Sequence, residues 1–258
     1  MTCLLRKTVL YVVMATSYSI TEYFGRNLAE LLSAKITKVY PAFKANAFHK
    51  RVEAQVAGKT YTQRILVHAE QLQQHLPGDY KEALPILLSI LGEENPHETG
   101  MFKHYYWILP IGKFISEYGL GHFNLSMKGI EEVTKRNTGE YAIRPFIEKY
   151  PGKTLQVMKK WAKSPNFHLR RLASEGLRPK LPWAPKLDIF IDDPDPVFQI
   201  LEMLKEDEVM FVKKSVANHL TDWLKVNPEK TLPLIKAWKK TGNIHTQWIL
   251  KRAVRKLT

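Results

Sequence analysis

The chain has 258 residues, 45% of them hydrophobic, which is enough to bury a core in one large domain or two small ones. Lys and Arg number 39 against 25 Asp and Glu, and the net charge of +14 favours a phosphate-rich partner, although it also fits a basic surface that only aids solubility. The single cysteine, Cys3, excludes a disulfide framework or a thiolate metal site within the chain and fits a reducing cytosol, so we expect a cytoplasmic protein.

The sequence of the N-terminal segment does not indicate a part of a folded domain. Arg6 and Lys7 precede an apolar run over residues 8–15 that resembles a weak signal peptide but is too short to span a bilayer. Translation could also begin at Met14. We therefore predict that residues 1–19 are a leader, disordered or not native, and that residues 20–258 form a single domain.

The spacing of apolar residues predicts helices throughout. Apolar side chains recur at intervals of three and four over residues 28–36, 84–91 and 198–204, and no segment alternates with period two. Pro and Gly separate segments of helical length at residues 77–79, 151–152, 164–166 and 227–229. The fold class is therefore expected to be all-α.

The second half repeats an apolar helix, a polar turn and a helix that opens with an apolar residue and two basic ones. The anchors Leu169, Val212 and Leu250 are 43 and 38 residues apart, the period of HEAT-type helical pairs. In such a solenoid the second helix of each pair lines a concave face. The dibasic pairs 170–171, 213–214 and 251–252 would then form a basic concave track for a phosphate backbone, although three exposed helix starts would also explain them.

Three carboxylates and one tryptophan stand among these basic residues. Glu140 and Glu175 are 35 residues apart, close to one repeat, so they could occupy similar places on adjacent second helices. Asp222 and Trp183 complete the set. Carboxylates in a basic groove weaken phosphate binding and are easier to understand if they meet developing positive charge.

Each of these residues also has an ordinary structural explanation. Glu175 could pair with Arg171 four residues earlier, and Glu140 could charge a helix start after Thr138. Asp222 could neutralise Lys225 or His219, and Trp183 could plug a joint between repeats. There is no glycine-rich phosphate loop and no close His pairing, so the residues predict neither a cofactor nor a metal site.

Three segments resemble the AlkC-type DNA glycosylases of the HEAT-like-repeat DNA alkylation-repair superfamily. They are Glu140-Tyr-Ala-Ile-Arg-Pro-Phe146, the long stretch from Arg170 to Ala184, and Ser215-Val-Ala-Asn-His-Leu-Thr-Asp222. The resemblance runs from about Ile20 to the C-terminus.

The resemblance implies a monofunctional glycosylase of the bacterial cytosol that excises 3-methyladenine, 3-methylcytosine and 1-methyladenine from double-stranded DNA. It also implies no metal, no cofactor, no membrane, a monomer, and a lesion that need not be fully flipped. Some members carry an additional C-terminal immunoglobulin-like domain, which we expect to be absent here. The rival hypotheses are a non-catalytic HEAT-repeat protein that binds damaged or branched DNA, and a protein-binding HEAT array.

Carried over by position, Glu140 is the leading catalytic carboxylate, with Glu175 and Asp222 lining the same site. The residues expected to contact the lesion or the DNA are Trp183, Arg144, Arg170, Arg171, Arg178, Lys213, Lys214, Asn218, Lys251 and Arg252.

Overall fold

The computed structural model describes residues 19–100 and 102–255. The predicted leader, residues 1–19, lies outside the described residues except for Ser19, whose side chain caps the first helical turn. Within the described ranges every regular element is a helix, as the apolar spacing predicts.

The elements follow one another in this order. The α-helices are α1 Arg26–Val39, α2 Ala45–Val56, α3 Tyr61–His75, α4 Tyr80–Ser89, α5 Phe102–Tyr105, α6 Leu109–Tyr118, α7 Phe123–Thr134, α8 Glu140–Lys149, α9 Pro151–Trp161, α10 Phe167–Glu175, α11 Asp195–Leu204, α12 Met210–Val226, α13 Pro228–Lys239 and α14 Ile244–Val254. The 3-10 helices are η1 Ile20–Tyr23 and η2 Tyr106–Ile108.

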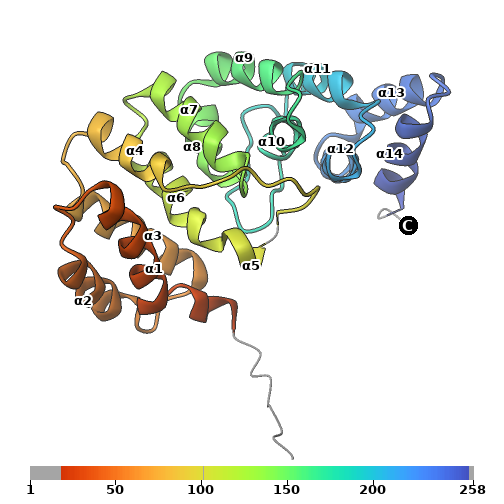
Figure 1. Ribbon diagram of the computed structural model, residues 1–258. Coiled ribbons are helices and arrows are strands. Elements are labelled where there is room, and N and C mark those ends of the chain that lie inside the picture. The colour runs from red at the N-terminus through yellow and green to blue at the C-terminus, as the bar shows by residue number, and fades with distance from the viewer. Residues whose placement is uncertain (1–18, 101, 256–258) are drawn as a thin grey trace, which may run out of the picture.

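The helices form a helical-repeat solenoid that follows an arc from the N-terminal to the C-terminal end (Figure 1). In one layer α3, α6 and α8 pack in succession, and α10, α12 and α14 do the same. In the other layer α9 packs against α8, α10 and α11, and α13 packs against α12 and α14. Helices of the first layer, α8, α10 and α12, carry the candidate site.

Asparagine caps fix where several helices of the second half begin. The side chain of Asn166 accepts a hydrogen bond from the backbone N–H of His168 at 2.9 Å, and Asn227 accepts one from Lys230 at 3.1 Å. Asn243 caps α14 in the same way. Each such cap stabilises its helix by about 1 kcal/mol, because it satisfies a backbone donor that has no partner within the helix.

The predicted repeat register is correct for two anchors and wrong for the third. Leu169 and Val212 are each the third residue of their helix, α10 and α12, and both are buried. Leu250 is also buried, but it is the seventh residue of α14, because the cap at Asn243 starts that helix at Ile244. Lys251 and Arg252 therefore lie in the last turn of α14 and not at its start.

Candidate active site

The three predicted carboxylates come together in space although they lie at different points of their helices. Glu140 is the first residue of α8, Glu175 is the last residue of α10, and Asp222 lies in the second half of α12. The expectation that Glu140 and Glu175 hold equivalent helix positions is therefore wrong. All three are buried, with 6%, 6% and 8% of their surface exposed.

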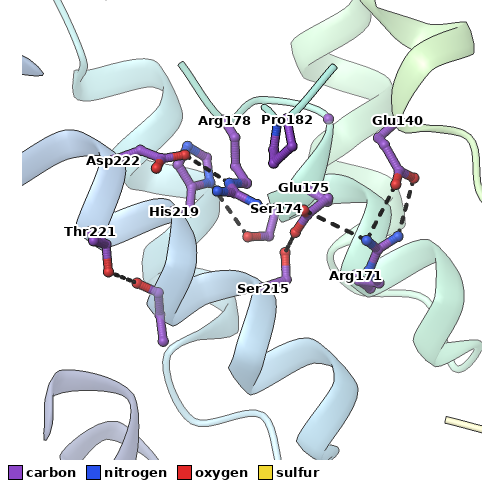
Figure 2. A network of polar contacts seen from close by, with 12 residues as sticks. Glu140, Arg171, Ser174, Glu175, Arg178, Pro182, Ser215, His219, Thr221 and Asp222 are labelled. Carbon is purple, nitrogen blue, oxygen red and sulfur yellow. Dashed lines mark hydrogen bonds and ion pairs between the residues drawn. The ribbon is translucent and has the colours of Figure 1, made fainter. Parts of the chain in front are cut away.

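Two arginines join the three carboxylates into one line, the ion-pair chain Glu140–Arg171–Glu175–Arg178–Asp222 (Figure 2). Arg171 donates from Nη1 to Glu140 Oε2 at 3.1 Å and from Nη2 to Glu140 Oε1 at 3.3 Å, and its Nη2 lies 3.6 Å from Glu175 Oε1. Arg178 donates from Nη1 to Glu175 Oε1 at 2.7 Å and from Nε to Asp222 Oδ2 at 2.8 Å. With all five groups ionised, three carboxylates and two guanidiniums leave one excess negative charge.

These contacts decide between the structural explanations considered for the three acids. Glu175 does pair with Arg171 within α10, and Glu140 does open a helix, but neither stops there, because the same Arg171 bridges both. Asp222 forms its ion pair with Arg178 and not with Lys225 or His219. The acids are thus members of one buried cluster and not separate surface ion pairs.

Two glycines allow the backbone to approach closely enough for this cluster to form. A Cβ at Gly139, just before Glu140, would collide with Thr134 and would lie 3.3 Å from Leu172 of α10. A Cβ at Gly176, just after Glu175, would lie 2.9 Å from Ile143 of α8. Both positions must lack a side chain, because an added Cβ would prevent the close packing of α8 on α10.

Burial and the arginines set the ionisation of the acids. Burial raises the pKa of Glu175, but the charges of Arg171 and Arg178 and the hydrogen bond from Ser215 more than offset it and hold that pKa below its ordinary value. Burial raises the pKa of Asp222 above its ordinary value, and Arg178 opposes this only in part. The middle of the ion-pair chain at Glu175 and its end at Asp222 are therefore electrostatically different environments.

Further contacts hold the arginines and Glu175 in place, and the sequence did not single them out. Ser215 Oγ donates to Glu175 Oε2 at 2.6 Å, and Arg171 Nη1 donates to Thr138 Oγ1 at 3.0 Å. The guanidinium of Arg171 lies 4.7 Å from the centroid of the Phe211 ring. Ser215 is the first residue of one of the segments quoted above and Thr138 lies two residues before another, so these segments were the available signal.

Trp183 belongs to the segment between α10 and α11, residues 176–194, which we call the Trp183 loop. Its side chain is 73% exposed, so the prediction that it could plug a joint between repeats is wrong. Its backbone has φ of 61°, in the left-handed region, which is strained for a residue other than glycine. Its ring meets Tyr61 of α3 edge-on, with centroids 5.9 Å apart.

Arg144 holds the Trp183 loop and is not placed to contact DNA. Only 4% of its surface is exposed, and burial lowers its pKa. Its Nη1 donates to the carbonyls of Gly176 at 3.4 Å and Arg178 at 3.0 Å, and its Nη2 donates to that of Pro185 at 2.5 Å. The sequence-based role of Arg144 is corrected accordingly, because its donors are used to fix a loop.

A cleft of about 410 Å³ opens beside Trp183, between α3, α6 and α8. We call it the aromatic cleft. Its walls include the rings of Tyr61, Tyr141 and Trp183, and Thr138 and Tyr141 place it next to Glu140. Burial and the charge of Glu140 raise the pKa of both tyrosines to about 12, so their phenols are neutral at physiological pH. Tyr61 lies in a helix far earlier in the chain, and no local pattern could have assigned it to this site.

The predicted basic track is only partly present. Arg170 donates from Nε to Asp207 Oδ2 at 2.6 Å and from Nη1 to the carbonyls of Ser164 and Pro165, both at 3.0 Å. Its guanidinium thus joins the start of α10 to the turn before α12. The guanidinium of Arg170 is therefore occupied by contacts within the protein, which corrects its assignment to the phosphate track.

The other dibasic residues divide into enclosed and exposed ones. Lys213 is buried, with Nζ 3.2 Å from His245 Nδ1 and 5.7 Å from the centroid of the Trp248 ring, and so does not project from the surface as predicted. Arg252 is half-buried against the same ring. Lys214 and Lys251 are exposed. Asn218 is half-buried in α12.

Residues 19–100 and 102–255 show neither a clustered metal site nor a membrane-spanning helix. No set of three or more His, Cys, Asp or Glu side chains in these ranges is arranged to hold a metal ion. No helix in the same ranges combines the length and the apolar character needed to cross a membrane.

The chain is similar to known proteins in both sequence and structure. The family model described as DNA alkylation repair enzyme matches residues 137–257, the part of the chain that holds the ion-pair chain. The chain is similar to a solved structure of Pseudomonas fluorescens alkylpurine DNA glycosylase AlkC bound to DNA containing an abasic-site analogue, with a TM-score of 0.85 and 36% sequence identity over 94% of this chain.

The chain is also similar in sequence to a curated protein. YhaZ of Bacillus subtilis (strain 168), itself uncharacterised, is 36% identical over 237 residues, or 92% of this chain. The chain spans 64% of YhaZ and 65% of the AlkC chain, just under two thirds of each.

Proposed function

We propose that this protein is a monofunctional DNA glycosylase that hydrolyses the N-glycosidic bond of cationic alkylated bases in double-stranded DNA. The observation that carries the proposal is the ion-pair chain, a buried cluster with one excess negative charge in a protein whose net charge is +14. The overall charge attracts the phosphate backbone, and the local charge favours a positive centre. The similarity to AlkC agrees with this reading.

The chemistry needs little from the enzyme beyond electrostatics. In a base alkylated at N3 of adenine the ring is already cationic, so the bond between C1′ and the ring nitrogen breaks with its electron pair moving to the base, which leaves neutral. The sugar becomes an oxocarbenium-like cation. Water then adds to C1′ and loses a proton.

Glu140 is the proposed catalytic carboxylate. Both of its oxygens accept hydrogen bonds from Arg171, and a carboxylate offers about four acceptor positions, so lone pairs remain for a water molecule. Held in this way, Glu140 can stabilise the sugar cation and accept the proton of the attacking water. Glu175 and Asp222 extend the negative potential, and Arg171 and Arg178 hold the three acids in line.

Trp183 is the proposed contact for the lesion. A cationic ring against an indole gains about 0.5–2 kcal/mol relative to a neutral ring, which would select alkylated bases without a tight pocket. The proposed substrates are the three bases that the resemblance implies, 3-methyladenine, 3-methylcytosine and 1-methyladenine, and we propose that they are attacked without full base flipping. The exposed Lys214 and Lys251 are proposed to meet phosphates, and the protein is proposed to act as a monomer.

The direct test is release of free bases from DNA treated with a methylating agent, followed by chromatography under single-turnover conditions. Wild-type protein should release 3-methyladenine, and Glu140→Gln should slow release by about 10²–10⁴-fold, since each tenfold step corresponds to about 1.4 kcal/mol of transition-state stabilisation. Glu206→Gln is the matched control, because Glu206 is exposed between α11 and α12, and it should release bases at the wild-type rate.

Two outcomes would overturn the proposal. If the wild type releases none of the three bases, the protein is not this glycosylase, and binding of the same DNA would then support a non-catalytic damage-binding role. If release occurs but Glu140→Gln matches the wild type, the assignment of Glu140 is wrong.

A further inference from the structure

Apart from Trp183, the lining of the aromatic cleft has no part in the bond-breaking step described above, although the cleft adjoins the residues that carry that step. Thr138 and Tyr141 flank Glu140 at the start of α8 and line the cleft, and Trp183 forms part of its rim. A ligand in the cleft would therefore lie beside the end of the ion-pair chain where Glu140 acts.

The lining of the cleft suits a flat, mostly apolar ligand. Three rings, those of Tyr61, Tyr141 and Trp183, combine with aliphatic side chains such as Ile65 and Leu66. Polar and charged side chains, among them Thr62, Lys113 and Glu148, line the same space and offer hydrogen-bond donors and acceptors at a ligand's edge. The volume of about 410 Å³ lies within the range of small-molecule pockets, about 300–1,000 Å³, and exceeds what one purine base needs.

The structure also shows that the cleft is shaped before any ligand arrives. The Trp183 loop is fixed by Arg144 and by the hydrogen bond from Tyr141 Oη to the carbonyl of Pro182 at 3.2 Å. Trp183 meets Tyr61 across the cleft with ring planes at 64°. The aromatic wall thus joins the two halves of the chain.

We propose that the aromatic cleft is a binding site for the free alkylated purine base after its bond to the sugar has broken. The inference rests on the proposed function and deepens it by naming where the product goes. The electron pair of the broken bond neutralises the base, so the leaving group is a flat, uncharged heteroaromatic ring. Such a ring suits an aromatic and aliphatic cleft better than it suits the charged line of Glu140, Glu175 and Asp222.

The test is equilibrium dialysis of the full chain against free 3-methyladenine, with the base measured by ultraviolet absorbance. The wild type should bind one base saturably, and Tyr61→Phe should bind it equally well. Tyr61→Ala should weaken binding by about tenfold, the size expected for loss of one stacked aromatic partner.

A second pair of variants keeps the test valid if Tyr61→Ala does not fold. Leu66→Trp places a large ring in the cleft and should abolish binding. Leu155→Trp is its matched control, a half-buried leucine of α9 that does not line the cleft, and should bind as the wild type does. Free 3-methyladenine should also inhibit base release by the wild type but not by Leu66→Trp.

The outcomes separate this inference from the proposed function. If the wild type releases bases from DNA but does not bind free 3-methyladenine, or if Leu66→Trp and Leu155→Trp bind it equally, the cleft inference is wrong and the glycosylase proposal stands. If the free base binds in a Leu66-dependent way but no base is released from DNA, the cleft binds a purine base while the glycosylase proposal fails.

Discussion

Removal of Arg178 should test whether the ion-pair chain holds the solenoid together as well as forming the candidate site. Arg178 lies between Glu175 of α10 and Asp222 of α12, at 2.7 and 2.8 Å. Replacing it with methionine keeps a long apolar stem but leaves two carboxylates facing each other without their common partner. The change should loosen the contact of α10 with α12.

The magnitude follows from burial. The three side chains are 8–12% exposed, so water screens them poorly. Breaking a buried ion pair by removing one partner destabilises a protein by about 3–5 kcal/mol, and the residual exposure places this case near the lower bound. For a chain of this size a loss of 3 kcal/mol lowers the melting temperature by roughly 6–12 °C.

The assay is thermal unfolding followed by circular dichroism, with Arg26→Met as the matched control. Arg26 also bridges two carboxylates, Glu30 at 2.8 Å and Glu53 at 2.7 Å, but the three side chains are about half exposed. Its loss should lower the melting temperature much less, because solvent screens the pair. Arg178→Met combined with Glu175→Gln should recover part of the loss, since the two carboxylates that Arg178 had bridged then no longer repel each other.

Equal effects of Arg178→Met and Arg26→Met would refute this reasoning, because burial would then have no bearing on the strength of the pairs. Strict additivity of Arg178→Met and Glu175→Gln would also refute it, because residues in direct ionic contact are expected to couple.

Three further predictions follow from individual residues. Trp183→Gly should raise the melting temperature slightly, because glycine tolerates a positive φ, and should reduce base release; a fall in stability would show that the backbone there is not strained. Burial raises the pKa of Glu175, but the charges of Arg171 and Arg178 outweigh it and hold that pKa below its ordinary value of 4.5. The ion pairs of Glu175 therefore stabilise the fold above pH 4.5, and this stabilisation is lost as the pH falls through the pKa of Glu175 in the folded protein. Glu175→Gln should therefore reduce the loss of melting temperature as the pH falls below 4.5, and an unchanged acid slope would contradict this. Lys214→Gln and Lys251→Gln should each reduce the slope of log K for DNA binding against log salt by about 1, and an unchanged slope would remove that lysine from the interface.

The fold was predictable from the sequence because apolar spacing is a direct consequence of helix geometry. The period of three and four identified the helices, and Leu169 and Val212 marked equivalent positions in α10 and α12. The register failed at Leu250 because the comparison matched an apolar-basic-basic triplet and overlooked the capping asparagine at 243. A cap is local evidence for a helix start, whereas basic residues occur anywhere on an exposed face.

The candidate site was predictable in part, for a related reason. The resemblance supplied Glu140, Glu175 and Asp222, and the structure brings them together. Residues that act across repeats could not be found, since Tyr61 reaches Trp183 from α3 and leaves no local pattern. Positive charge alone was also a poor guide to DNA contacts. Arg144 and Arg170 have the charge of phosphate ligands, but their N–H groups donate to backbone carbonyls and to Asp207.

The anchoring of the Trp183 loop has a consequence for how fast DNA could be recognised. Because Arg144 and Tyr141 hold the backbone of the loop and the indole ring packs against Tyr61, less freedom of the loop and of the ring is lost when DNA binds. A flexible lid would add a closing step on the microsecond-to-millisecond scale to every encounter. A preorganised ring can instead sample each base pair for as long as the protein is in contact with it, which suits a protein that must inspect many intact bases for every damaged one.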